Sequence, residues 1–148
     1  MIYRASHHFF FYNFFRLYSV WKTRHCFRRV YLDCNYTEKG LPVLLISNHF
    51  SWWDGFWSVW LNEKVFHRVY WFMMLEEQLK KTMFLNKAGG YSVKKGSRSV
   101  AETISYTTNL LSDSRNLVLI FPQGEISSMH TREFIFEKGI EHIIRRCE

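Results

Sequence analysis

Residues 117–121 read LVLIF, an uninterrupted apolar run that begins after Asn116 and ends before Pro122. Its length and its lack of any polar position predict a buried strand. Strands of this kind are typical of parallel sheets, in which helices cover both faces. The run therefore favours an α/β fold, and the segments on either side of it lead to the same expectation.

Three further runs are predicted as strands: LPVLLI over residues 41–46, VYWFMM over 69–74 and YSV over 91–93. Helices are predicted over residues 54–62, over 76–88 up to Gly89-Gly90, from Ser99 onward, and around residues 136–144. Ser99 and Glu102 fit a capping box at the start of the third helix. Strands that alternate with helices predict an α/β fold with a mixed, partly parallel sheet flanked by helices.

The composition limits the class of protein. A length of 148 residues suits one domain, and 19% aromatic residues exclude an intrinsically disordered chain. Three cysteines without a CxxC pair argue against a disulfide framework and favour a reducing, cytoplasmic setting. No stretch reaches the roughly 18 consecutive apolar residues of a membrane-spanning helix, and no secretory signal is recognisable.

Residues 1–32 carry six of the 20 basic residues, none of the 13 acidic residues, and eleven aromatic side chains. One predicted helical face carries Phe10, Phe14, Leu17, Tyr18 and Trp21. This combination is typical of an amphipathic helix in the interface of an anionic membrane. A core helix with a basic end is the alternative, and no nucleic-acid partner is expected because no recognisable binding module accompanies the charges. We therefore expect 1–32 to be a peripheral, cytoplasmic-side membrane segment, followed by an α/β domain over 33–148.

The polar turn after the first predicted strand holds a histidine and, five residues later, an aspartate, His49 and Asp54. On one regular helix they would point about 140° apart, so they meet only if His49 lies on the turn and Asp54 in the first helical turn. Asp54 then accepts a hydrogen bond from one ring nitrogen and leaves the other as a general base. The alternative is a turn histidine beside an aspartate that the helix dipole favours.

Four short motifs stand in order along residues 41–147. Asn48-His49 and Asp54 form NHxxxxD, residues 90–95 read GYSVKK, residues 121–127 read FPQGEIS, and residues 136–139 read FEKG. In this order and at these spacings they resemble the motifs of the lysophospholipid acyltransferases. That family includes the glycerol-3-phosphate and 1-acylglycerol-3-phosphate acyltransferases.

The resemblance implies transfer of a fatty acyl group from acyl-CoA or acyl carrier protein to a hydroxyl of a lysophospholipid or related lipid. His49 would be the general base and Asp54 would orient it, with no acyl-enzyme. No metal and no bound cofactor would be required. The substrate-binding residues that the resemblance implies are Asn48, Lys95, Phe121, Pro122, Gln123, Gly124 and Glu125.

The motifs depart from the family pattern where a phosphate would bind. Lys95 stands where arginine is usual and Ile126 replaces the arginine of the third motif, so the site has less positive charge than a lysophosphatidate enzyme. Glu125 favours an acceptor with a hydroxyl or amine head group. The chain also ends before a fourth motif of the family, so we expect a domain that is truncated at its C-terminus. A catalytically inactive, membrane-binding remnant is the second hypothesis.

Overall fold

The computed structural model describes residues 1–147 and contains one sheet of four strands. These are β1 (Val43–Ile46), β2 (Val69–Leu75), β3 (Gly90–Val93) and β4 (Asn116–Ile120). Their order across the sheet is β1-β4-β2-β3, and all three neighbouring pairs are parallel. The α/β prediction is confirmed, and within the described residues the sheet is parallel throughout.

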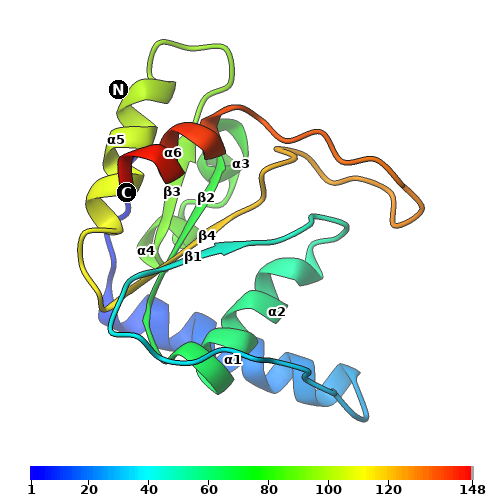
Figure 1. The fold of residues 1–148 in the computed structure, drawn as a ribbon. Coiled ribbons are helices and arrows are strands. Elements are labelled where there is room, and N and C mark those ends of the chain that lie inside the picture. Colours follow the sequence, from blue (N-terminus) through cyan, green and yellow to red (C-terminus); the bar gives the residue numbers. More distant parts are fainter. Residues whose placement is uncertain (148) are drawn as a thin grey trace.

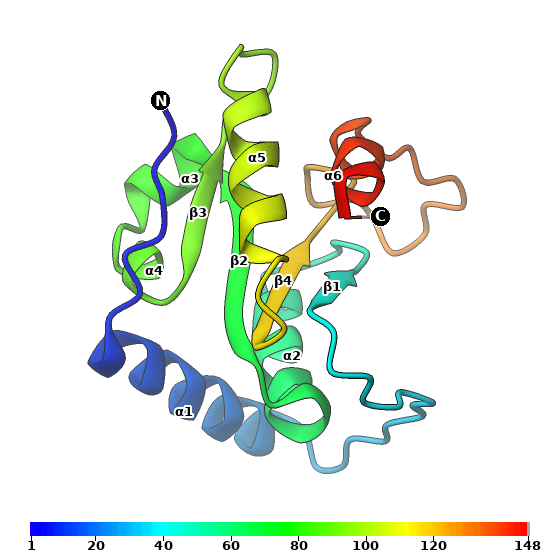
Figure 2. The same ribbon diagram turned by 60° about the vertical axis from the view of Figure 1, so that its left-hand side comes forward.

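Helices cover both faces of this sheet (Figures 1 and 2). On one face lie α1 (Phe9–Cys26) and α2 (Trp53–Leu61), which continues as the π-helical turn η1 (Asn62–Phe66). On the other face lie α5 (Val100–Leu110) and α6 (Gly139–Cys147). The short helices α3 (Glu76–Lys81) and α4 (Phe84–Lys87) connect β2 to β3.

The strand β4 lies between β1 and β2 and is buried along its whole length. Leu117 and Leu119 pack in the core cluster under α1 and α2, whereas Val118 and Ile120 pack in the cluster under α5 and α6. Successive side chains of a strand point to opposite faces, so both faces of β4 need apolar residues. This explains why the run has no polar position.

The N-terminal segment runs beside the outer edge of β3. The Ser92 N–H donates a hydrogen bond to the Tyr3 carbonyl over 3.0 Å, and the Ser6 N–H donates to the Asn86 carbonyl over 3.2 Å. Ile2 is buried. This segment and α1 therefore pack directly against the α/β body.

Two predicted helices differ from those observed. The helix expected over residues 76–88 is divided at Thr82, whose hydroxyl donates to the Gln78 carbonyl while its N–H turns to Leu79. Such local side-chain hydrogen bonds compete with the helix. The last helix begins at Gly139, after Phe136, because the Glu137 N–H donates to the Pro122 carbonyl over 2.9 Å.

The capping box expected at Ser99 does not form. Ser99 has helical backbone angles, φ −69° and ψ −9°, and its hydroxyl contacts Ser97. Glu102 instead forms ion pairs with the N-terminal ammonium group at 3.5 Å and with Arg4 at 3.8 Å. The Glu102 carboxylate, which the sequence pattern predicted to cap the helix, therefore binds the N-terminal segment.

Candidate active site

The candidate site lies at the carboxyl edge of the sheet. Ile46 at the end of β1 is in register with Ile120 at the end of β4. Because the two strands are parallel neighbours, the turn after β1 and the loop after β4 begin side by side. Crevices at the carboxyl ends of parallel strands are the usual place for ligands in such sheets.

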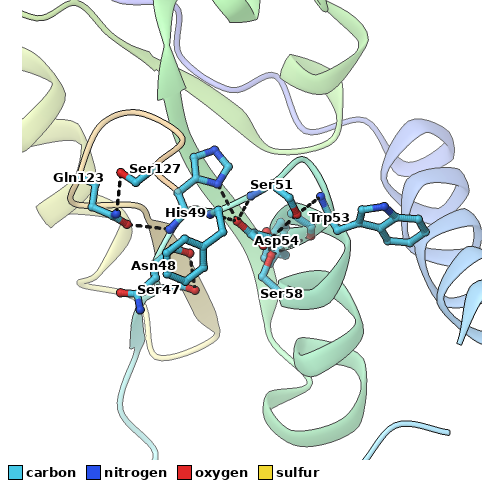
Figure 3. A network of polar contacts seen from close by, with 12 residues as sticks. Ser47, Asn48, His49, Ser51, Trp53, Asp54, Ser58, Gln123 and Ser127 are labelled. Carbon is cyan, nitrogen blue, oxygen red and sulfur yellow. Dashed lines mark hydrogen bonds and ion pairs between the residues drawn. The ribbon is translucent and has the colours of Figure 1, made fainter. Parts of the chain in front are cut away.

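His49 and Asp54 meet at this edge of the sheet (Figure 3). His49 lies on the turn, Asp54 is the second residue of α2, and the imidazole Nδ1 is 2.9 Å from the carboxylate Oδ2. The same Oδ2 accepts hydrogen bonds from the N–H groups of Phe50, at 2.6 Å, and Ser51, at 2.8 Å. Both side chains are partly buried, at 22% and 17% exposure. Asp54 therefore fixes the shape of the turn as well as the orientation of the ring.

The partner of Nδ1 determines the tautomer of the imidazole. A carboxylate oxygen accepts the hydrogen bond, so Nδ1 is the donor, and in the neutral imidazole Nε2 is left with its lone pair. Nε2 has no hydrogen-bond partner within residues 1–147. A histidine held in this way can take a proton from a hydroxyl group at Nε2.

The loop after β4 holds His49 from the other side. The Phe121 ring stacks on the imidazole at a centroid distance of 4.0 Å and an angle of 14°. Gln123 is only 8% exposed, and its Oε1 accepts a hydrogen bond from the His49 N–H over 2.7 Å. Its Nε2 donates to Ser127 Oγ over 3.0 Å, and the Ser127 N–H donates to the His49 carbonyl over 2.8 Å. Both backbone groups of His49 are therefore fixed by this loop.

Lys95, which follows β3, reaches the same loop. Its Nζ is 2.8 Å from Glu137 Oε1. The ammonium group lies against Gly124, where a Cβ atom would be only 2.6 Å from Nζ. Gly124 has a φ of +71°, which glycine adopts without strain.

The remaining predicted residues differ in their surroundings. Pro122 is buried and its carbonyl anchors Glu137, while Asn48 and Glu125 are exposed. Within residues 1–147 neither the Asn48 amide group nor the Glu125 carboxylate forms a hydrogen bond or an ion pair. Gln123, expected to contact substrate, is engaged by His49 and Ser127.

Two residues of the site were missed in the sequence, Ser127 and Glu137. Each lies inside a motif, Ser127 as the last residue of FPQGEIS and Glu137 as the second of FEKG. The motif matches alone did not show which of their side chains or backbone groups touch the other motifs.

A family model described as Acyltransferase matches residues 29–148. This range includes every residue of the candidate site. Comparisons with curated proteins and with solved structures find no match.

Proposed function

The chain belongs to the acyltransferase family, and from that premise we propose that it transfers a fatty acyl group from acyl-CoA or acyl carrier protein to a hydroxyl of a lysophospholipid or related lipid. The observation that carries this proposal is the contact of His49 Nδ1 with Asp54 at 2.9 Å. It leaves Nε2 free to act as a base.

In the proposed reaction, Nε2 of His49 takes the proton of the acceptor hydroxyl as its oxygen attacks the thioester carbonyl carbon. A C–O bond forms, and the carbonyl oxygen becomes an oxyanion that needs hydrogen-bond donors. The oxyanion then collapses, the C–S bond breaks, and the imidazolium proton passes to the leaving thiolate. Asp54 stabilises the imidazolium, no acyl-enzyme forms, and no metal or bound cofactor is needed.

Positioning residues support this role. Phe121 and Gln123 hold the ring and the backbone of His49, so the base keeps one orientation with little loss of entropy during the reaction. The direct test is incubation of the protein with labelled acyl-CoA and a lysolipid. Labelled diacyl product from the wild type, and none from His49→Gln, is the expected result. Equal product from both would overturn the proposal.

We also propose that α1 binds an anionic membrane surface. Its inner face, with Tyr12 and Phe15, packs on the sheet. Its outer face leaves large side chains in solvent, with Phe10 at 74%, Phe14 at 69% and Leu17 at 61% exposure. Contiguous exposed apolar surface of this kind marks an interaction site. Within residues 1–147, no helix is long and apolar enough to cross a membrane.

The charges at the end of α1 support a lipid surface as the partner. Arg16 is paired with Glu63 at 2.8 Å. Four other basic residues lie in the last turns of α1 or just after it and form no ion pair within residues 1–147: Lys22, Arg24, Arg28 and Arg29. Each basic residue near an anionic membrane contributes about 1 kcal/mol to binding, and salt screens this attraction.

Vesicle sedimentation tests the membrane proposal. Deleting residues 1–32 would also remove Tyr12 and Phe15, which are partly buried against the sheet, so point variants on the outer face are preferable. The double variant Phe10→Ser/Phe14→Ser should bind phosphatidylglycerol/phosphatidylcholine vesicles at least about tenfold more weakly than the wild type, because two aromatic side chains no longer enter the interface. Ile135→Ser removes an apolar residue elsewhere that is even more exposed, at 87%, and is the control. Equal binding by the double variant and the wild type would contradict the proposal.

A further inference from the structure

The ion pair between Lys95 and Glu137 lies at the edge of the candidate active site. The Nζ and Oε1 atoms are 2.8 Å apart, and the two side chains are 44% and 58% exposed. A bound molecule at the carboxyl edge can therefore reach both groups. The charges that such a molecule meets near His49 therefore depend on where Lys95 and Glu137 lie.

The pair is held over the loop that carries Gln123. A Cβ atom on Gly124 would lie 2.6 Å from Lys95 Nζ and 3.4 Å from Glu137 Cγ, so both side chains pack against this glycine. Gly124 follows Gln123, whose side chain accepts the hydrogen bond from the His49 N–H. The backbone of Glu137 is anchored to the same loop through the Pro122 carbonyl. The ion pair is thus built into the loop that positions the proposed base.

We propose that Glu137 is a specificity-determining residue that disfavours acceptors carrying a phosphate monoester. This inference rests on the proposed function and names the acceptor class of that same site. An ammonium group that already contacts a carboxylate offers little net positive charge to a second anion. A phosphate dianion must displace Glu137 from Lys95 and remain close to its negative charge.

An uncharged hydroxyl head group meets neither obstacle. It can accept a hydrogen bond from Lys95 or donate one to Glu137 while the ion pair stays in place. The structure therefore favours a lipid acceptor without a phosphate monoester, such as a monoacylglycerol. Glu125, which lies next to Gly124 and is exposed, adds further negative charge to this edge.

The first experiment measures head-group binding without turnover. The ¹⁵N-labelled protein is titrated with sn-glycerol 3-phosphate, and the Gly124 amide resonance reports binding. Glu137→Gln should lower the dissociation constant about three- to tenfold, because Lys95 is freed and a repulsive charge is lost. Glu137→Asp keeps the charge and should behave as the wild type.

Two controls separate this effect from a general change of charge. Glu141→Gln removes a carboxylate that pairs with Arg145 on α6 and not with Lys95, and it should change the dissociation constant less than twofold. In a Lys95→Met background, Glu137→Gln should lower the dissociation constant of sn-glycerol 3-phosphate only slightly. Any of three results would overturn the proposal: an equal gain in affinity from Glu141→Gln, no gain from Glu137→Gln, or a full gain from Glu137→Gln in the Lys95→Met background.

The second experiment measures acyl transfer to lysophosphatidate and to monoacylglycerol. Glu137→Gln should lower the ratio of the KM for lysophosphatidate to the KM for monoacylglycerol about three- to tenfold. An unchanged ratio of the two KM values would refute the specificity role. Absence of turnover in every variant would count against the proposed reaction, whereas the binding titration would still decide the role of Glu137.

Discussion

Replacing Asp54 by asparagine separates the structural and chemical roles of this carboxylate. Its Oδ2 accepts hydrogen bonds from His49 Nδ1 at 2.9 Å and from the N–H groups of Phe50 and Ser51 at 2.6 and 2.8 Å. Asparagine retains an oxygen that can accept the same bonds. Because hydrogen bonds to an ionised acceptor are roughly twice as strong as those to a neutral one, we expect Asp54→Asn to lose about 1–2 kcal/mol of unfolding free energy.

The expected loss of activity is larger. In the proposed mechanism an imidazolium forms at His49. Without the negative charge of Asp54 this imidazolium is no longer stabilised, and the asparagine amide can also favour the wrong tautomer. We expect kcat to fall by about 10²–10⁴-fold, which corresponds to about 3–5 kcal/mol of transition-state stabilisation. Small domains have about 5–15 kcal/mol of stability, so the variant should remain folded while its turnover is nearly lost.

The assay follows transfer of labelled acyl chains from acyl-CoA to a lysolipid. A thiol reagent for released CoA is unsuitable because Cys26, Cys34 and Cys147 are free and exposed. The variants are His49→Ala, Asp54→Asn and their combination, and urea unfolding followed by circular dichroism measures stability. Asp113→Asn is the matched control, since Asp113 pairs with Arg115 in an exposed turn.

If His49 and Asp54 act as one unit, the double variant should be barely slower than either single variant. Additive losses would show that the two residues act independently. A folded Asp54→Asn protein with near-normal turnover would refute the mechanism outright. Reduced turnover in Asp113→Asn would point to a general effect of the lost charge.

Three further outcomes are expected. Gln123→Ala should lower kcat about tenfold, because the partly buried N–H of His49 loses its acceptor. Gln123→Glu should retain most activity, since its carboxylate can accept the same bond, and equal kinetics of the two variants would argue against a positioning role. Burial lowers the pKa of His7 below its usual 6.5, so the undocked N-terminal segment binds more protons. Docking of this segment should weaken as the pH falls from 6.5 through the lowered pKa. The measurement is the protection factor of the Ser92 amide, the ratio of its intrinsic to its observed exchange rate, which should fall with pH in the wild type and not in His7→Gln. Leu119→Ala should cost about 3 kcal/mol in urea unfolding, because Leu119 is fully buried in the central strand, and a loss below about 1 kcal/mol would contradict that placement.

Short-range patterns were sufficient to predict the strands and the local part of the site. The run over residues 117–121 is apolar throughout because β4 is buried on both faces, and this property is visible without knowing its neighbours. His49 and Asp54 are only five residues apart, with the end of β1 before them and α2 beginning between them. Their contact therefore follows from a strand, a turn and a helix that the sequence itself indicates.

The other contacts of the site join segments that are distant in the sequence. Gln123 reaches His49 across 74 residues, and it does so because β4 is placed next to β1 in the order β1-β4-β2-β3. Long-range packing also brings Lys95 to Glu137. It likewise determines that Phe15 points into the core whereas Phe14 points into solvent. A local pattern shows that a segment must bury apolar surface, but the partner that buries it depends on strand order and register. Long-range contacts determine that order and register, and they must offset the entropy cost of closing the intervening loops. The contact between His49 and Asp54 is therefore determined by the local sequence, whereas the loop that holds His49 and the charged pair beside that loop are determined by the tertiary structure.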